Sequence, residues 1–280
     1  MKKLAYVNGS LVPEDAAAVS VLDYGFLYGY GVFESLRAYN GRIFLLEEHL
    51  RRLACGAERI GLKADLKEVR NALDMTLAVN NLMDAYIRVT LTFGVGGPRM
   101  ALNENVKPSV IVIAGGIPAN LDGMCLKGVS VGFSEVRHYS MNPLNGIKTL
   151  NYLPIALRKL EAKKRKLDDL IILNEKNHAV EATTSNLFVV GKNGSLSTPR
   201  IEDGCLSGIT REAVIKLAKK LGIKTVENKI KKDELLKVKE AFLTNSIAGI
   251  IPVIRIEKRK ISIGRTTRML QKSYKESTLT

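Results

Sequence analysis

The spacing of apolar and polar residues changes several times along the chain, and each change predicts a new element of secondary structure. Asn8-Gly9 lies between two short apolar runs, and Asn40-Gly41 separates the alternating residues 33–39 from residues 42–45. An Asn-Gly pair between such runs is a strong signal for a tight β-hairpin. The chain is therefore predicted to begin with antiparallel strand pairs.

Apolar residues next repeat at helical spacing over residues 47–60 and 66–79, and β-branched alternation returns at 85–93 and 108–114. Beyond residue 128 both periods occur. The pattern there predicts strands over residues 129–133, 169–173, 178–181, 186–190, 240–244 and 249–256, and helices over residues 151–166, 210–221 and 265–274.

A stretch rich in glycine and polar residues, which begins at Gly115, predicts a connection between two domains. We expect a small N-terminal domain over residues 1–117, an interdomain loop over residues 118–126 and a larger domain over residues 127–280. The arrangement of strands and helices in two segregated domains predicts the α+β fold class.

Composition excludes several classes of protein. The chain has 280 residues, of which 46% are hydrophobic, so it can bury a sizeable core. Its apolar runs are too short to cross a bilayer, and its first residues lack the apolar core of a signal peptide. Cys55, Cys125 and Cys205 form no Cys-x-x-Cys pair, and there are only three histidines. We expect a cytoplasmic protein with no membrane partner, disulfide framework or metal site.

The formal net charge of +15 raises nucleic-acid binding as an alternative. The positive residues fall mainly on the outer faces of predicted helices, as in residues 158–166 and 216–220. No aromatic residues interleave with them to stack on bases. We therefore expect a solvated lysine-rich surface and no nucleic-acid partner, with a basic nucleic-acid-binding protein kept as a remote alternative.

Two segments carry the candidate chemistry: Lys148 lies in Asn145-Gly-Ile-Lys-Thr-Leu-Asn-Tyr152, and Glu181 begins Glu-Ala-Thr-Thr-Ser-Asn-Leu-Phe188. A deprotonated lysine can condense with an aldehyde and then move a proton between a substrate carbon and a cofactor. A glutamate can keep a pyridine nitrogen protonated, which makes the ring a stronger electron sink. These are the minimal requirements of a pyridoxal-phosphate enzyme.

The two segments and their spacing resemble those of the class IV aminotransferases. This fold-type IV family depends on pyridoxal 5′-phosphate (PLP) and contains branched-chain and D-amino-acid transaminases and aminodeoxychorismate lyase. The resemblance extends from Asn8-Gly9 to the last predicted helix. It implies a small α/β sandwich-like domain, a larger domain with a β-barrel-like core, and PLP between the two. It also implies a homodimer or higher homo-oligomer, because loops of one subunit border the other's site in this family.

The resemblance assigns roles to individual residues. Lys148 is the expected catalytic residue. Leu206-Ser-Gly-Ile-Thr-Arg211 runs into the predicted helix 210–221, where free amides can bind a phosphate and Thr210 can cap the helix. His49-Leu-Arg-Arg-Leu53 makes Arg52 the guanidinium partner of the phosphate, while Arg51 is expected to face elsewhere. The expected cofactor-binding residues are Arg52, Lys148, Tyr152, Glu181, Leu206, Gly208, Ile209, Thr210, Ser246 and Ile247.

Other motifs concern the substrate. Tyr28-Gly-Tyr-Gly-Val-Phe33 resembles the amino-terminal signature of the family, and Tyr86-Ile-Arg88 resembles the Tyr-x-Arg of branched-chain transaminases, in which the arginine can receive the second carboxylate of glutamate. Gly-Gly-Pro-Arg99 is similar to a segment that carries an arginine in D-amino-acid transaminases. Thr244-Asn-Ser246 is similar to the corresponding segment of sequences that resemble aminodeoxychorismate lyase. The expected substrate residues are Tyr28, Phe33, Tyr86, Arg88 and Arg99.

The function implied by the resemblance is transfer of an amino group from a branched-chain L-amino acid to 2-oxoglutarate. Elimination of pyruvate from 4-amino-4-deoxychorismate and D-amino-acid transamination are the alternatives within the family. Both alternatives use the same lysine, so the catalytic residue does not distinguish them.

Overall fold

The structure is a computed structural model that describes residues 2–96, 99 and 106–279. It divides into two compact units, Met1–Ile117 with Ile147–Tyr152, and Pro118–Gly146 with Leu153–Thr280. The segment that contains Lys148 therefore clusters with the first unit, although the sequence places it within residues 127–280. As domains, residues 1–117 and 127–280 stay predictions.

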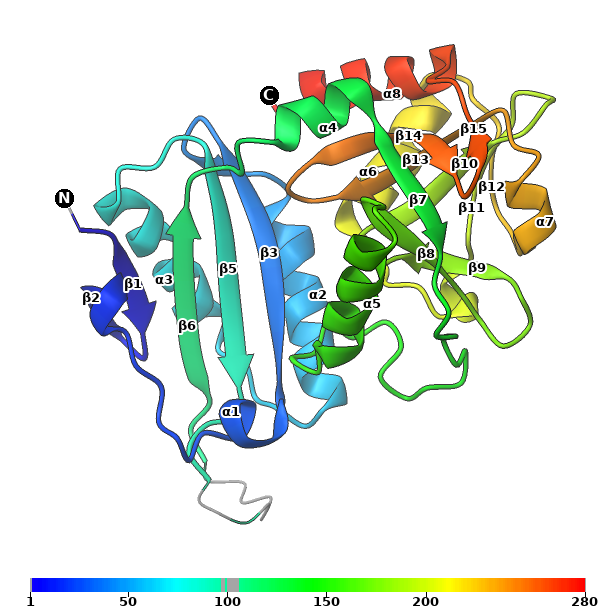
Figure 1. Ribbon diagram of the computed structural model, residues 1–280. Helices are drawn as coiled ribbons and strands as arrows, with labels where there is room; N and C mark the ends of the chain where they lie inside the picture. Colours follow the sequence, from blue (N-terminus) through cyan, green and yellow to red (C-terminus); the bar gives the residue numbers. More distant parts are fainter. Residues whose placement is uncertain (1, 97–98, 100–105, 280) are drawn as a thin grey trace. The chain divides into compact units, whose positions relative to one another are not determined.

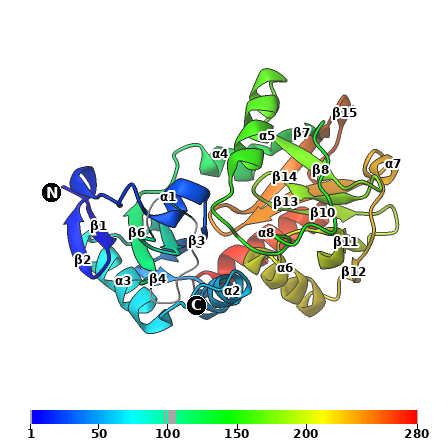
Figure 2. The same cartoon turned by 90° about the horizontal axis from the view of Figure 1, so that it is seen from below.

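The first unit is built on an antiparallel six-stranded sheet with the strand order β2-β1-β6-β5-β3-β4 (Figure 1). Helices α2 and α3 lie together along one face of this sheet (Figure 2). Its elements are β1 (Leu4–Val7), β2 (Ser10–Pro13), the 3-10 helix η1 (Glu14–Ala16), α1 (Tyr24–Tyr28), β3 (Gly31–Tyr39), β4 (Arg42–Ile43), α2 (Leu46–Arg59), α3 (Leu66–Val79), β5 (Ala85–Thr92) and β6 (Ser109–Gly115).

The two predicted hairpins are confirmed. Asn8 and Gly9 both have positive φ angles, of 48° and 94°, and Val7 pairs with Ser10 across the turn. Asn40 and Gly41 repeat this geometry between β3 and β4. Asparagine and glycine tolerate this left-handed backbone, which is why the turns form at these pairs.

The alternation of β3 and β5 separates a core face from a second face. Leu36 and Ile87 are directly paired and fully buried, and they belong to one apolar core with Leu53 of α2 and Leu73 of α3. Because successive strand side chains point to opposite faces, the residues between them face the other way. The second face carries Phe33 of β3 and Tyr86 and Arg88 of β5, which are candidate substrate residues.

The second unit contains a mixed nine-stranded sheet that curls into a half-barrel, with the order β12-β11-β10-β13-β14-β7-β8-β9 and β15 paired to β14 (Figure 1). Its elements are α4 (Leu121–Lys127), β7 (Val129–Phe133), α5 (Leu153–Lys164), β8 (Asp169–Leu173), β9 (Ala179–Ala182), β10 (Asn186–Val190), β11 (Leu196–Thr198), η2 (Ile201–Asp203), α6 (Ile209–Lys220), β12 (Thr225–Glu227), α7 (Lys232–Leu235), β13 (Glu240–Asn245), β14 (Gly249–Ile256), β15 (Arg259–Lys260) and α8 (Arg265–Ser277).

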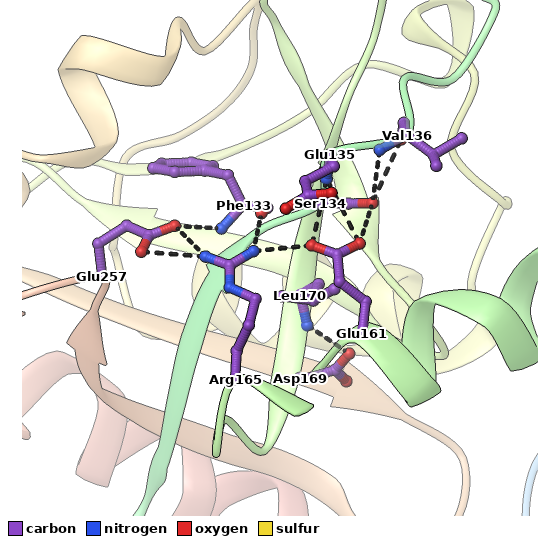
Figure 3. Close-up of polar contacts among 9 residues, drawn as sticks. All are labelled: Phe133, Ser134, Glu135, Val136, Glu161, Arg165, Asp169, Leu170 and Glu257. Carbon is purple, nitrogen blue, oxygen red and sulfur yellow. Dashed lines mark hydrogen bonds and ion pairs between the residues drawn. The ribbon is translucent and has the colours of Figure 1, made fainter. Parts of the chain in front are cut away.

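A cluster of ion pairs joins α5 to the ends of two strands in the second unit (Figure 3). Arg165, just beyond α5, donates to Glu161 at 2.7 Å and to Glu257 at 2.9 and 3.1 Å. The same guanidinium donates to the carbonyl of Phe133 at the end of β7, and Glu257 accepts from the amide of Phe133. These charge-assisted bonds fix α5 against β7 and the turn after β14.

Two local expectations are wrong. Residues 118–126 are not simply a loop, because Leu121–Lys127 forms α4. Thr210 does not cap its helix, because α6 begins at Ile209 and Gly208 occupies the N-cap position without a capping side chain. Short polar segments carry weak periodicity, and a glycine can occupy an N-cap as readily as threonine. Within residues 2–96, 99 and 106–279, no helix has the length and apolarity that crossing a membrane requires.

Candidate active site

The candidate catalytic lysine is held by backbone pairing with β3. The amide of Phe33 donates to the carbonyl of Lys148 at 3.0 Å, and the amide of Leu150 donates to the carbonyl of Gly31 at 3.0 Å. Between these two bonds, Thr149 forms an antiparallel bridge with Val32. The main chain of the half-buried Lys148 is therefore fixed to a strand of the first unit, although the segment itself is irregular.

The ring of Phe33 brings together four of the predicted site residues. The Lys148 Nζ atom lies 4.6 Å from the ring centroid, and the Arg88 guanidinium carbon lies 3.6 Å from it. The Tyr152 ring meets the Phe33 ring edge-on, with centroids 5.2 Å apart. Phe33 is only 2% exposed, so it forms a rigid apolar surface for these polar groups. An amine, a guanidinium and a phenol thus share one aromatic neighbour.

Of the other predicted substrate residues, Tyr86 lies on this face, and Tyr28 and Arg99 both contact Tyr24. Tyr86 is half-buried on the same face of the sheet as Arg88. Tyr28 stacks edge-on against Tyr24 at 5.2 Å, and the hydroxyl of Tyr24 donates to the carbonyl of Arg99 at 2.5 Å. The buried Tyr24 thus contacts both Tyr28 and the backbone of Arg99, whose side chain is exposed.

Arg52 is held by a buried carboxylate that the sequence motifs did not single out. Its Nε and Nη2 atoms donate to Glu34 at 2.7 Å each, and His49 Nδ1 lies 2.8 Å from the same carboxylate. Burial alone would raise the pKa of Glu34, but the charge of Arg52 and bonds from His49 and Arg52 lower it to about 2. Glu34 therefore stays ionised and orients the guanidinium that the sequence assigns to the phosphate.

In the second unit, Glu181 lies on β9 and meets the loop before α6. Its Oε2 atom accepts from the amide of Leu206 and from Asn186 Nδ2, both at 3.2 Å. Asn186 also donates to the carbonyl of Leu206 at 2.9 Å. Glu181, Asn186 and Leu206 are therefore fixed to one another, and Glu181 and Leu206 are two of the expected cofactor-binding residues.

The same asparagine explains why Gly208 is a glycine. A Cβ atom at this position would overlap Asn186 Oδ1, while the φ angle of −72° is open to any residue. The constraint is steric and lets the chain enter α6 in an extended conformation. The first amides of α6 receive no capping side chain, which leaves the positive end of the helix suited to an anion.

The loop with Ser246 and Ile247, two of the expected cofactor-binding residues, follows β13. Asn245 Oδ1 accepts from the amides of Ile247 and Ala248 at 3.0 and 2.8 Å, and its Nδ2 donates to Ser185. These bonds fold residues 245–248 into a tight turn. Beside it, Thr244 Oγ1 is buried with no hydrogen-bond partner in the described part of the chain. An unpaired buried hydroxyl next to this turn fits a loop that binds a polar ligand.

Sequence reasoning missed two charged residues that the structure makes prominent. Glu34 follows Phe33 in the amino-terminal signature, and its strand position on the core face beneath α2 is the signal that identifies it. Arg158 is buried on α5, although the sequence shows it as one of several positive residues on the outer face of a predicted helix. No local pattern distinguishes this arginine from its exposed neighbours.

Comparison with known proteins agrees with this arrangement. Residues 31–256 match the family model for amino-transferase class IV. The chain is 39% identical over 276 residues to a putative branched-chain-amino-acid aminotransferase of Methanocaldococcus jannaschii, covering 97% of this chain and 95% of that protein.

Two solved structures share the fold. The branched-chain aminotransferase of Thermoproteus uzoniensis with norvaline has a TM-score of 0.91 and 34% identity, covering 100% of this chain and 95% of the other. The 4-amino-4-deoxychorismate lyase of Pseudomonas aeruginosa has a TM-score of 0.88 and 29% identity, covering 98% of both chains.

The chain belongs to the class IV aminotransferases, the PLP-dependent enzymes of fold type IV. The expected family, fold class, enzyme class and cofactor are thereby confirmed. The residues present also fit the cofactor: a lysine for the aldehyde, a carboxylate for the ring nitrogen, and, for the phosphate, a helix end without a capping side chain and an asparagine-stabilised turn.

The Glu34 cluster predicts a dependence of stability on pH. The folded pKa of about 2 lies below the ordinary value of 4.5, so this carboxylate stabilises the fold above about pH 5, and the contribution is lost as pH falls toward 2. Glu34→Gln should lower the free energy of unfolding at pH 7 by about 3 kcal/mol. The difference between wild type and variant should shrink as pH falls, which denaturant unfolding at several pH values will measure.

Glu47→Gln is the matched control, because Glu47 also pairs with an arginine but is 64% exposed at its side chain. Its effect should be at most about 1 kcal/mol and should show no comparable narrowing. A Glu34→Gln effect that stayed constant from pH 7 to pH 3 would contradict the assignment of a buried, ionised carboxylate.

Proposed function

We propose that this aminotransferase moves the amino group of a branched-chain L-amino acid to 2-oxoglutarate, with Lys148 as the catalytic residue. The observation that carries the proposal is the shared contact of Lys148 and Arg88 with the ring of Phe33. This contact supports a site in which Lys148 is the base for the α-proton of the substrate and Arg88 is the cation for a substrate carboxylate. The names of the similar proteins from M. jannaschii and T. uzoniensis support the same substrate class.

The proposed cofactor-binding residues belong to both units: Arg52, Lys148 and Tyr152 to the first, and Glu181, the start of α6 and the turn after β13 to the second. When bound, PLP supplies an aldehyde that captures amines and a ring that takes up electrons from the substrate carbon. Glu181 would hold the ring nitrogen in its protonated form, and Leu206 would contact the ring. Tyr152 would donate to the phenolic oxygen. The residues that would bind the phosphate are Arg52, Gly208, Ile209, Thr210, Ser246 and Ile247.

Lys148 performs the proton transfers. Its amine would remove the proton from the α-carbon of the substrate and deliver it to C4′, the aldehyde carbon of the cofactor. The pairing of its backbone with β3 limits where the amine can reach. Phe33, Tyr28 and Tyr86 form the apolar wall for a branched side chain, and Arg88 binds the second carboxylate when glutamate occupies the site.

A second candidate function is elimination of pyruvate from 4-amino-4-deoxychorismate. The sequence Thr244-Asn-Ser246 and the similarity to the lyase of P. aeruginosa favour it. A D-amino-acid transaminase is the third candidate and relies on Arg99, whose side chain is exposed. Both candidates keep Lys148 in its role and differ only in the residues that meet the substrate.

A homodimer belongs to the same proposal. Helix α5 exposes Leu153, Leu157 and Leu160, whose side chains are 69%, 54% and 53% accessible and recur at helical spacing. Such an apolar stripe is suited to burial against a second copy of the chain. We also propose a cytoplasmic location. Cys55, Cys125 and Cys205 lie far apart along the chain and form no Cys-x-x-Cys pair, which suits a reducing compartment.

Replacement of the catalytic lysine gives the first test. Lys148→Ala should abolish the visible absorption of bound PLP and lower turnover by about 10³-fold or more, because the amine that holds the aldehyde and moves the proton is lost. Lys163→Ala, which removes an exposed lysine of α5, should leave both unchanged. Wild-type turnover in Lys148→Ala would exclude the assignment.

The substrate is tested with a panel of amino acids. L-Leucine, L-isoleucine and L-valine with 2-oxoglutarate should be converted to 2-oxo acids faster than their D-enantiomers, as measured by chromatography of the products. Arg88→Met should raise the KM for 2-oxoglutarate by about tenfold, because a carboxylate bond to a guanidinium is lost. Release of pyruvate from aminodeoxychorismate without an amino acceptor would instead establish the lyase.

The dimer is tested by charging the apolar stripe. Leu157→Asp should convert the dimer into a monomer in light-scattering chromatography, because a carboxylate would be buried without a partner. Leu126→Asp is the control, since Leu126 is 66% exposed on α4. A dimer that survives Leu157→Asp would place the interface elsewhere.

A further inference from the structure

Helix α5 has an inverted distribution of residues. Its buried residues are Arg158 and Ala162, whereas Leu157 and Leu160 are exposed. The helix packs against β8, and Arg158 is only 6% exposed. Arginine is among the residues least often buried, so a guanidinium here occupies a position that an apolar side chain would normally fill.

The buried guanidinium has an unsatisfied group. Its Nε atom lies buried with no hydrogen-bond acceptor within the described residues. Removing a charge from water costs several kcal/mol unless another charge compensates for it. Arg158 must therefore be stabilised by a carboxylate in its surroundings, and the position of that carboxylate determines what the arginine can do.

Two carboxylates act on Arg158. Burial lowers the pKa of Arg158, while Glu181 first and Glu161 second raise it. Glu161 is already engaged, because it accepts from Arg165 at 2.7 Å and from the amide of Glu135 at 3.2 Å (Figure 3). Glu181 has the larger of the two effects on Arg158.

The topology places the two residues on neighbouring elements. Helix α5 packs on β8, and Glu181 of the adjacent strand β9 is paired opposite Ile172 of β8. The hydrogen bonds to Glu181 come from the amide of Leu206 and from Asn186, which are both neutral. Helix α5 adds the positive charge of Arg158 to the surroundings of this carboxylate.

We propose that Arg158 is a positioning residue for the reaction: its buried guanidinium keeps the Glu181 carboxylate ionised, the form that can hold a protonated ring nitrogen. The inference rests on the proposed function, in which Glu181 meets that nitrogen. A protonated Glu181 would not balance a pyridinium, and the ring would then lose its proton and some of its capacity for electrons. Arg158 acts through Glu181 and touches no reacting atom.

The other titratable groups near this pair do not replace Arg158. Burial lowers the pKa of His138, and Arg158 adds to this effect while Asn145 and Glu175 oppose it. Burial, with a further contribution from Glu181, raises the pKa of Cys205 to about 12. Both groups are therefore neutral near pH 7. The other charged groups act on single members of this cluster: Glu161 on Arg158, Glu175 on His138, and Asp203 and Arg211 on Cys205. Arg211 donates to Glu227 and to the carbonyl of Pro199.

The test compares Arg158→Met, which removes the charge, with Arg158→Lys, which keeps it. In carboxyl NMR of the full chain without added PLP, with Glu181 assigned through Glu181→Gln, its titration midpoint should lie about one pH unit higher in Arg158→Met. Arg158→Lys should restore most of the wild-type midpoint. Lys159→Met is the control, because Lys159 follows Arg158 directly on the same helix but pairs with Asp169.

With PLP bound, Arg158→Met should release the cofactor and change its visible spectrum at a pH about one unit higher than wild type. In the Glu181→Gln background the same substitution should cause no further shift. An unchanged midpoint of Glu181, or an equal shift in both backgrounds, overturns the proposal. If Arg158→Met fails to fold, Arg158→Gln against Arg158→Lys provides the same comparison.

The outcomes separate this inference from the proposed function. If Arg158→Met leaves the titration midpoint of Glu181 unchanged and PLP binds normally, only the role of Arg158 is rejected. Visible absorption that survives Lys148→Ala rejects the proposed function, whereas the coupling of Arg158 to Glu181 is measured without cofactor and is judged independently.

Discussion

The pairing of the lysine segment with β3 is the constraint on which the chemistry depends. Two backbone hydrogen bonds attach residues 148–150 to Gly31 and Phe33, so the main chain of Lys148, the proposed catalytic residue, is fixed to a buried strand. Because Phe33 lies on the same strand, its ring and the lysine share one frame of reference. A rigid support of this kind is what proton transfer requires, since small displacements of a base reduce rates steeply.

One carboxylate in each unit accepts several hydrogen bonds and orients its neighbours. The buried Glu34 binds Arg52 and His49 of α2 in the first unit, and the half-buried Glu181 binds the loop that enters α6 in the second. The donors to Glu34 make the burial of its charge tolerable. Charge is therefore used here mainly to orient side chains and loops, while the apolar cores of the two units supply most of the stability.

Much of the fold was predictable from local signals. The Asn-Gly hairpins, the helix Leu66–Val79 and the strands Val129–Phe133 and Gly249–Ile256 agree with the apolar pattern, because each has a strong period or a diagnostic turn. Helix α4 and the start of α6 were not predicted correctly, since short polar segments leave the choice to their surroundings.

The candidate site divides in the same way. Motifs identified Lys148, Glu181 and Gly208, because chemistry or a close approach of the backbone restricts which residue can stand there. Glu34 and Arg158 were missed, because their importance arises from burial, and burial of a charged residue is set by segments far away in the sequence.

The raised pKa of Cys205 affects how this enzyme meets oxidants and alkylating reagents. Reaction requires the thiolate, and a thiol that titrates at about 12 and is 1% exposed supplies almost none of it. The loop that contains Cys205 and Leu206 is therefore shielded from covalent damage, although it lies next to the proposed cofactor-binding residue Gly208. Cys55, which is exposed, is the position where electrophiles can add to the chain without disturbing that loop.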